Sequence, residues 1–180
     1  VIDAAKGVEA QTRKLFRVCA MRDIPIFTFI NKMDREARDP FELCEELEKE
    51  LGIDTYAMNW PIGCGKEFQG VYDRQNRQII HFTSNTNARA ATATQIELDD
   101  PALAGLIGQA KKDQLTDEIE LLDGASCDFD MDRVRHGKLS PVFFGSALTN
   151  FGVEPFLEEF LRMTTPPLPR KAGEDIIDSF

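Results

Sequence analysis

The sequence predicts an α/β fold: a doubly wound parallel sheet interrupted by a small α+β insertion. Strand-like and helix-like patterns alternate over residues 1–54, and one more strand and helix occupy 139–164. Between them, residues 55–138 hold short apolar pieces separated by turn residues. Alternating strands and helices are typical of a sheet covered by helices on both faces. Residues 165–180 begin with a proline-rich stretch, which we expect to form a stiff linker to a second domain.

The first part of the chain is expected to form strand, helix, strand and helix in turn. Residues 1–3 look like the end of a buried strand, and apolar residues recur at helical spacing over 11–21. Residues 26–30 form a nearly continuous apolar run, as expected of a central strand in a parallel sheet. Asp39, followed by a proline, marks the start of the next helix, and Gly52 marks its end.

The same pattern returns after the expected insertion. Residues 141–144 read as a second buried strand, closed by a Gly-Ser-Ala turn. Apolar residues then recur at the spacing of a strongly amphipathic helix. They are Val153, Phe156, Leu157, Phe160 and Leu161.

Composition and charge exclude several classes of protein. The net charge of −10 argues against direct DNA binding, since Lys and Arg must displace counterions from the phosphate backbone. No apolar run approaches the roughly 18 residues that a membrane span needs, so we expect no membrane partner. The four cysteines are widely spaced and form no Cys-x-x-Cys pair. They are expected to be structural thiols in a reducing cytoplasmic compartment, and no metal site is predicted.

The motif Asn31-Lys32-Met33-Asp34 directly follows a buried strand, where open α/β sheets place their ligands. The Asp34 carboxylate can accept hydrogen bonds from guanine N1–H and from the 2-amino group, which adenine lacks. Sites that pair buried polar groups can discriminate by about 10⁴ to 10⁵. Lys32 can lay its aliphatic stem over the base, and Asn31 can bind the base edge and tie this loop to its neighbours. A solvated loop would explain these four residues equally well.

A second loop, Gly145-Ser146-Ala147-Leu148, follows the other buried strand and precedes the amphipathic helix. The Ala147 N–H can donate to guanine O6, and the Ser146 hydroxyl can support the Asp34 carboxylate. A simple turn into a helix is the alternative for this loop alone. Two such loops in this order favour a guanine site, whose expected members are Asn31, Lys32, Asp34, Ser146, Ala147 and Leu148.

This pair of loops resembles the base-recognition half of the P-loop GTPases. Residues 3–12 are similar to the segment after the second switch in elongation factor G and its relatives. Further stretches resemble the peptide chain release factor 3 family of translational GTPases more closely than elongation factor G, and the resemblance covers about residues 1–170. They are residues 25–35, Asn59-Trp60-Pro61-Ile62-Gly63, Gly70-Val71-Tyr72-Asp73-Arg74 and residues 141–153.

The resemblance implies the C-terminal part of a GTP-binding domain, hence a partial P-loop GTPase-type sheet with an insertion between the two base-reading loops. It implies binding of GTP and GDP, and partners that are the ribosome and class I peptide release factors. Such a factor would promote GTP-dependent removal of class I release factors from the ribosome during translation termination. Two alternatives stay open: an elongation factor G-type translocase, or a non-catalytic interaction module with a vestigial guanine loop.

The sequence contains no G-x-x-x-x-G-K-[ST] phosphate loop. The resemblance places the switch threonine and the catalytic histidine before Val1, and neither His81 nor His136 has the context to replace that histidine. No catalytic residue is therefore assigned. Mg²⁺ is expected in the full-length protein, with ligands outside these residues, and the polypeptide alone is expected to be hydrolytically inactive.

Overall fold

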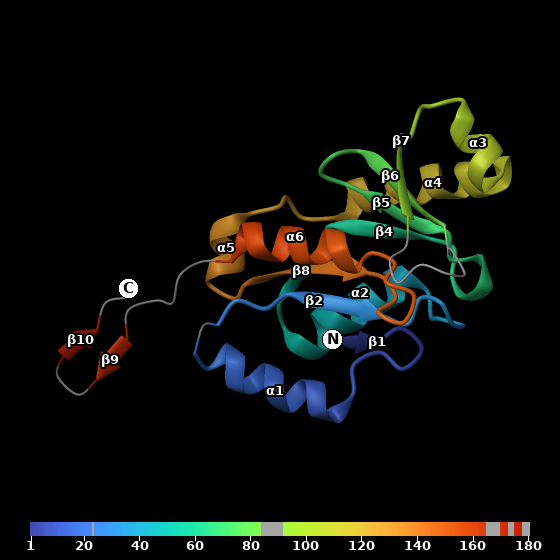
Figure 1. Cartoon of the computed structure of the whole chain (residues 1–180). Coiled ribbons are helices and arrows are strands. Elements are labelled where there is room, and N and C mark those ends of the chain that lie inside the picture. The colour runs from blue at the N-terminus through green and yellow to red at the C-terminus, as the bar shows by residue number, and fades with distance from the viewer. Residues whose placement is uncertain (23, 84–91, 165–169, 173–174, 178–180) are drawn as a thin grey trace.

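The structure is a computed structural model that describes residues 1–22, 24–83, 92–164, 170–172 and 175–177. The described residues contain one parallel and one antiparallel four-stranded sheet, with helices packed around them (Figure 1). Most of the expected linker at 165–180 lies outside the described residues. Its described part is a two-stranded antiparallel pair, β9 (Arg170–Ala172) and β10 (Asp175–Ile177).

The parallel sheet has the strand order β1-β2-β8-β3, and all three pairings are parallel. Its strands are β1 (Ile2–Asp3), β2 (Thr28–Asn31), β3 (Asp54–Ala57) and β8 (Leu139–Phe144). Strand β8 therefore lies between two strands that precede it by more than eighty residues. This arrangement confirms the predicted α/β class with a parallel sheet.

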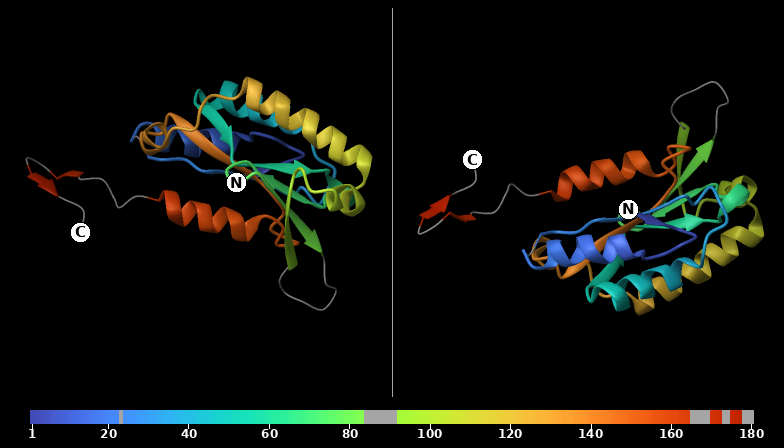
Figure 2. Two further views of the ribbon diagram at one scale, coloured as in Figure 1. Left: turned by 90° about the horizontal axis from the view of Figure 1, so that it is seen from above. Right: turned by 90° about the horizontal axis from the view of Figure 1, so that it is seen from below.

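Helices cover both faces of this sheet. Helices α1 (Ala10–Ala20) and α2 (Pro40–Leu51) lie on one face, and α6 (Val153–Met163) lies on the other (Figure 2). Successive residues of a strand pack against opposite faces of the sheet. Ile30 and Phe144 belong to the core that includes α2, whereas the ring of Phe143 packs at 5.0 Å from that of Phe156 in α6.

Local sequence signals explain where the helices begin and end. The Asp39 side chain accepts a hydrogen bond from the Phe41 N–H at 2.8 Å, and left-handed Gly52 ends α2 as predicted. The amphipathic stripe of α6 is wider than the surface it covers. Leu157 and Leu161 are 49% and 74% exposed, because Phe156 and its aromatic neighbours already fill the contact with the sheet.

The antiparallel sheet is a simple meander of four strands with the order β4-β5-β6-β7. It consists of β4 (Asn59–Ile62), β5 (Gly70–Asp73), β6 (Gln78–Thr83) and β7 (Thr92–Glu97). The helical segments of this region are η1 (Gly65–Glu67), α3 (Ala102–Ile107), α4 (Gln109–Ala125) and α5 (Met131–Arg135). None of the helices in the described ranges combines the length and apolar composition needed to cross a membrane.

The change from one sheet to the other differs from the expected boundary at residue 55. Strand β3 pairs with β8 in the parallel sheet, so the antiparallel sheet begins at Asn59. Only Met58 separates β3 from β4. The sequence does not show where the chain changes sheets, because the turn-type residues of the segment 56–62, Asn59 and Pro61, both lie within β4. The domain limits themselves stay a prediction.

Trp60 joins the two sheets into one hydrophobic core. Its side chain is fully buried, with ring centroids 4.5 Å from Phe41 of α2 and 5.4 Å from Phe144 of β8. The indole Nε1–H donates to the Glu118 carboxylate of α4 at 2.7 Å. A strand of the meander is thus fixed to the parallel sheet and to α4 at the same point.

Arg74 forms a second junction, just after β5. Its side chain is 6% exposed and donates to the Ala57 carbonyl at 3.1 Å and to Asp123 at 2.6 Å. The guanidinium also lies 4.4 Å from the centre of the Tyr56 ring. One side chain therefore connects β3, the meander and the end of α4.

We expect Arg74→Met to lower the free energy of unfolding by about 2–3 kcal/mol, because it leaves a buried carbonyl without its donor. Chemical denaturation would measure this loss. Arg17→Met, on the exposed surface of α1, is the matched control and should change stability by less than about 0.5 kcal/mol. Equal stability of the two variants would contradict the role given to Arg74.

Stability is also expected to depend on pH through His81 of β6. Its side chain is 9% exposed, its Nδ1 has no partner among the described residues, and burial lowers its pKa below 6.5. Above pH 6.5 the ring is neutral in both states. As the pH falls below 6.5, the unfolded chain takes up the proton first, so the free energy of unfolding decreases.

His81→Gln should therefore flatten the loss of stability between pH 7 and pH 5.5, measured by denaturant unfolding at each pH. His136→Gln, which removes an exposed histidine, is the control. An unchanged slope in the His81 variant would exclude this residue as the source.

Candidate guanine-nucleotide site

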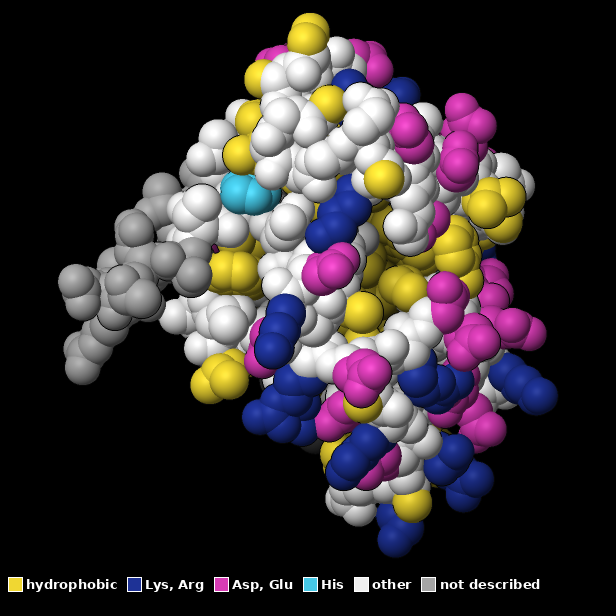
Figure 3. All heavy atoms as spheres, turned by 90° about the vertical axis from the view of Figure 1, so that its right-hand side faces the viewer, with side chains coloured by type: hydrophobic (Ala, Val, Ile, Leu, Met, Phe, Trp, Pro, Cys, Tyr) yellow, Lys and Arg dark blue, Asp and Glu magenta, His cyan; other side chains and the backbone are white. Residues whose placement is uncertain are grey.

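The two predicted loops leave the parallel sheet side by side. Strand β2 ends at Asn31 and β8 ends at Phe144, and Ile30 pairs with Phe144 in the parallel register. The carboxyl ends of both strands lie at one edge of the sheet. Figure 3 looks onto this side of the molecule, where apolar side chains lie in a hollow and acidic and basic side chains are mixed around it.

Ser146 and Asp34 are in direct contact. The Ser146 hydroxyl donates to Asp34 Oδ1 at 2.5 Å, and the serine is fully buried while the aspartate is half-buried. This is the support for the carboxylate that the sequence predicted. Because the hydroxyl holds one oxygen, the orientation of the carboxylate is fixed before any ligand binds.

Asn31 connects the two loops. Its Oδ1 accepts the Ala147 N–H at 2.9 Å and the Lys32 N–H at 2.8 Å. The predicted tie between neighbouring loops is therefore present. In this structure the Ala147 N–H is directed to Asn31, and its predicted bond to guanine O6 stays a prediction.

Lys32 takes the left-handed backbone conformation, with φ of 74°, and its ammonium bonds Asp3 Oδ2 at 2.6 Å. That hydrogen bond holds the pKa of the Asp3 carboxyl below its usual value. Asp3 ends β1 and pairs with Asn31, so three strands contribute to this edge. Sequence reasoning missed Asp3, although its place at the end of a strand was the available signal.

The backbone of the second loop is tightly closed. Ser146 and Phe151 exchange two backbone hydrogen bonds, of 2.8 and 3.0 Å. A β-carbon at Gly145 would lie 2.5 Å from the Phe151 carbonyl oxygen and 2.8 Å from the Phe29 ring, so only glycine fits there. Ala147 and Leu148 stand exposed at the tip, with Leu148 76% exposed.

These groups are suited to reading a base and carry no chemistry for cutting a phosphate. A fixed carboxylate, a backbone donor and an aliphatic lysine stem lie at one edge of the sheet. His81 lies in β6 and His136 follows α5, so neither is on the two loops. Within the described ranges, no three His, Cys, Asp or Glu side chains are grouped as a metal ion would require.

Residues 1–166 match the family model described as the elongation factor Tu GTP binding domain. The chain belongs to this family. It is 54% identical to peptide chain release factor 3 of Symbiobacterium thermophilum over 99% of the chain and 34% of that protein. It is also 54% identical to peptide chain release factor 3 of Synechococcus elongatus, over 95% of the chain and 31% of that protein.

The resemblance found in the sequence is thus confirmed, although the chain spans about a third of the length of these curated relatives. A crystal structure of a protein from Thermus thermophilus matches with a TM-score of 0.62 and 21% identity. The match covers 91% of this chain and 26% of that one. At this identity it supports the fold of the family domain and nothing finer.

We expect Ser146→Ala to weaken GDP binding by about tenfold in an intact protein that contains this chain, because Asp34 loses the donor that orients it. Isothermal calorimetry would measure the Kd. Ser140→Ala is the matched control: it removes a buried hydroxyl, bonded to Thr28 at 2.8 Å, from β8, the strand that leads into the Ser146 loop. If the Ser140 variant lost as much affinity as the Ser146 variant, the effect would be one of strand stability.

Proposed function

We propose that this chain forms the base-reading part of the GTP-binding domain in a translational GTPase that acts in translation termination. The hydrogen bond from Ser146 to Asp34 carries the proposal. It joins residues 112 positions apart, one from each of the two loops that the guanine hypothesis requires. A solvated loop after a strand does not require such a contact.

The contacts around Asp34 fit the guanine base. With Oδ1 bound by the serine hydroxyl, the carboxylate keeps lone pairs for the N1–H and the 2-amino group of guanine. Lys32 and Asn31 contribute the aliphatic stem and the amide on either side. Adenine would meet the carboxylate with a lone pair at N1, so this site would reject ATP.

The remaining parts of the activity are assigned to the intact protein. Relatives that bear the name peptide chain release factor 3 match this chain almost from end to end. We therefore propose cytoplasmic action at the ribosome, with GTP-dependent dissociation of class I release factors. The phosphate contacts, Mg²⁺ and the hydrolytic residues are proposed to belong to other parts of the longer protein.

Exchanging Asp34 for asparagine tests which base is read. Asp34→Asn should weaken GDP binding about 100-fold or more and improve binding of XDP, because the amide can donate to the 2-oxo group of xanthine. Competition calorimetry with both nucleotides measures the change. Asp39→Asn makes the same change of charge at a helix cap and should leave both affinities within about twofold, since asparagine also caps helices. Equal GDP affinity in parent and Asp34 variant would remove Asp34 from the site.

The termination step is tested on ribosomes that retain a class I release factor after peptide release. The intact protein should displace that factor with GTP, and the Asp34→Asn variant should do so with XTP. Movement of peptidyl-tRNA without displacement of the factor would instead identify a translocase.

A further inference from the structure

The antiparallel sheet contacts both loops of the candidate guanine site. The Gly65 N–H, in the connection between β4 and β5, donates to the Met33 carbonyl at 2.8 Å. Asn59, the first residue of β4, bonds the backbone of Phe144, the last residue of β8. The turn after β4 therefore contacts the first base-reading loop. Strand β4 itself contacts the end of β8, which leads into the second loop.

The contact made by Asn59 is buried and uses both ends of its amide. Its Oδ1 accepts the Phe144 N–H at 2.7 Å and its Nδ2 donates to the Phe144 carbonyl at 3.1 Å, with only 4% of the residue exposed. The register of β3 along β8 reaches only as far as Val142. Beyond that point the chain turns away into β4, and the Asn59 side chain takes the place of a strand partner for Phe144.

The position of Phe144 matters because a single residue, Gly145, separates it from Ser146. The Phe151 carbonyl and the Phe29 ring leave no room for a β-carbon at Gly145. A shift of Phe144 would therefore also move Ser146. Ser146 in turn orients Asp34. Asn59 touches no part of the expected base position, yet it fixes the strand end that carries one of the two loops.

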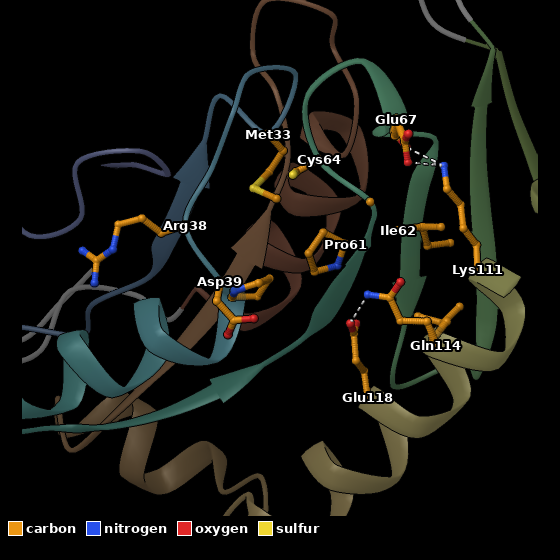
Figure 4. A pocket seen from close by; sticks show the side chains of 13 residues that line it. Met33, Arg38, Asp39, Pro61, Ile62, Cys64, Glu67, Lys111, Gln114 and Glu118 are labelled. Carbon is orange, nitrogen blue, oxygen red and sulfur yellow. Dashed lines mark hydrogen bonds and ion pairs between the residues drawn. The ribbon is translucent and has the colours of Figure 1, made fainter.

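The first loop is supported in the same way. Met33 is buried and lines a hollow of about 150 Å³ beneath the loop, together with Cys64 after β4 and Lys111 of α4 (Figure 4). The ion pair of Lys111 with Glu67, at 3.1 Å, closes the far side of this hollow. The direct support of the loop is the hydrogen bond from the Gly65 N–H to the Met33 carbonyl, and Gly65 follows β4 in the chain.

We infer that Asn59 is a positioning residue for the candidate guanine site and that the antiparallel sheet sets its affinity for guanine nucleotides. The inference rests on the proposed function and extends it to regulation. A displacement of the meander would act on the end of β8 through Asn59 and on the first loop through Gly65. Guanine binding and the position of the meander are thus coupled through two identified contacts.

The test compares Asn59→Asp with Leu103→Ala in the intact protein, using GDP and calorimetry. Asn59→Asp keeps the acceptor for the Phe144 N–H but sets an oxygen against the Phe144 carbonyl. Leu103 is fully buried in α3, on the far side of the meander, so its variant lowers stability without touching β8. We expect about tenfold weaker GDP binding in Asn59→Asp and a change of less than about twofold in Leu103→Ala.

A pH series separates positioning from loss of packing. Burial beside the Phe144 carbonyl should raise the pKa of the introduced carboxyl, so lowering the pH from 8 to 5.5 should protonate part of it and let it donate to that carbonyl. The affinity of Asn59→Asp relative to the parent should therefore recover, whereas that of Leu103→Ala should not.

A second variant covers the case in which Asn59→Asp does not fold. Gly65→Ala forces a side chain onto a residue with φ of 61°, although no atom lies within 3.7 Å of the new β-carbon. It should loosen the contact with Met33 and weaken GDP binding about threefold.

The outcomes distinguish the two proposals. A parent protein that binds no GDP overturns the proposed function and the inference with it. A parent that binds GDP, with Asn59→Asp and Gly65→Ala both as tight as Leu103→Ala, overturns the inference alone.

Discussion

The parallel pairing of β2 with β8 is the constraint on which the rest of the structure depends. It sets Ile30 opposite Phe144, although more than a hundred residues separate them along the chain. The contacts between the two base-reading loops follow from that register, because Asn31 ends β2 and Gly145 directly follows β8. A shift of one residue would separate Asp34 from Ser146 and would also turn each apolar side chain to the wrong face.

The antiparallel sheet shares a hydrophobic core and hydrogen bonds with the parallel sheet. Trp60 fills the space between α2 and β8, Arg74 connects the meander to β3, and Asn59 completes the hydrogen bonding of β8. The acidic residues of α4 contribute as well. Glu118 accepts the Trp60 indole N–H and Asp123 pairs with Arg74, so two acidic side chains of α4 bind the residues that join the two sheets.

Sequence reasoning was successful where one short segment contains the whole signal. The cap at Asp39 and the stop at Gly52 define α2, and the apolar runs define β2 and β8. The contact between Ser146 and Asp34 was also predictable, because strand ends of a parallel sheet meet at one edge. The use of these residues in nucleotide binding stays a prediction.

The parts that sequence reasoning missed depend on partners far away in the chain. The partnership of Asp3 with Lys32 needs the pairing of β1 with β2, and nothing near Asn59 shows that its amide faces Phe144. The end of β3 was missed for a different reason, since the turn-type residues that follow it, Asn59 and Pro61, lie within β4. The amphipathic helix α6 was predicted correctly, but helical periodicity does not reveal that Leu157 and Leu161 stay exposed.

The bond between the Ala147 N–H and Asn31 has a consequence for how selectivity arises. The donor that would face guanine O6 is bonded to Asn31 Oδ1 at 2.9 Å. A bound base would therefore exchange one hydrogen bond for another, and this contact would contribute little to overall affinity. The contact would instead contribute to selectivity. A base without an acceptor at that position would break the bond between Ala147 and Asn31 without forming a new one. The internal hydrogen bond between the two loops would therefore favour ligands that carry an acceptor at the position of guanine O6.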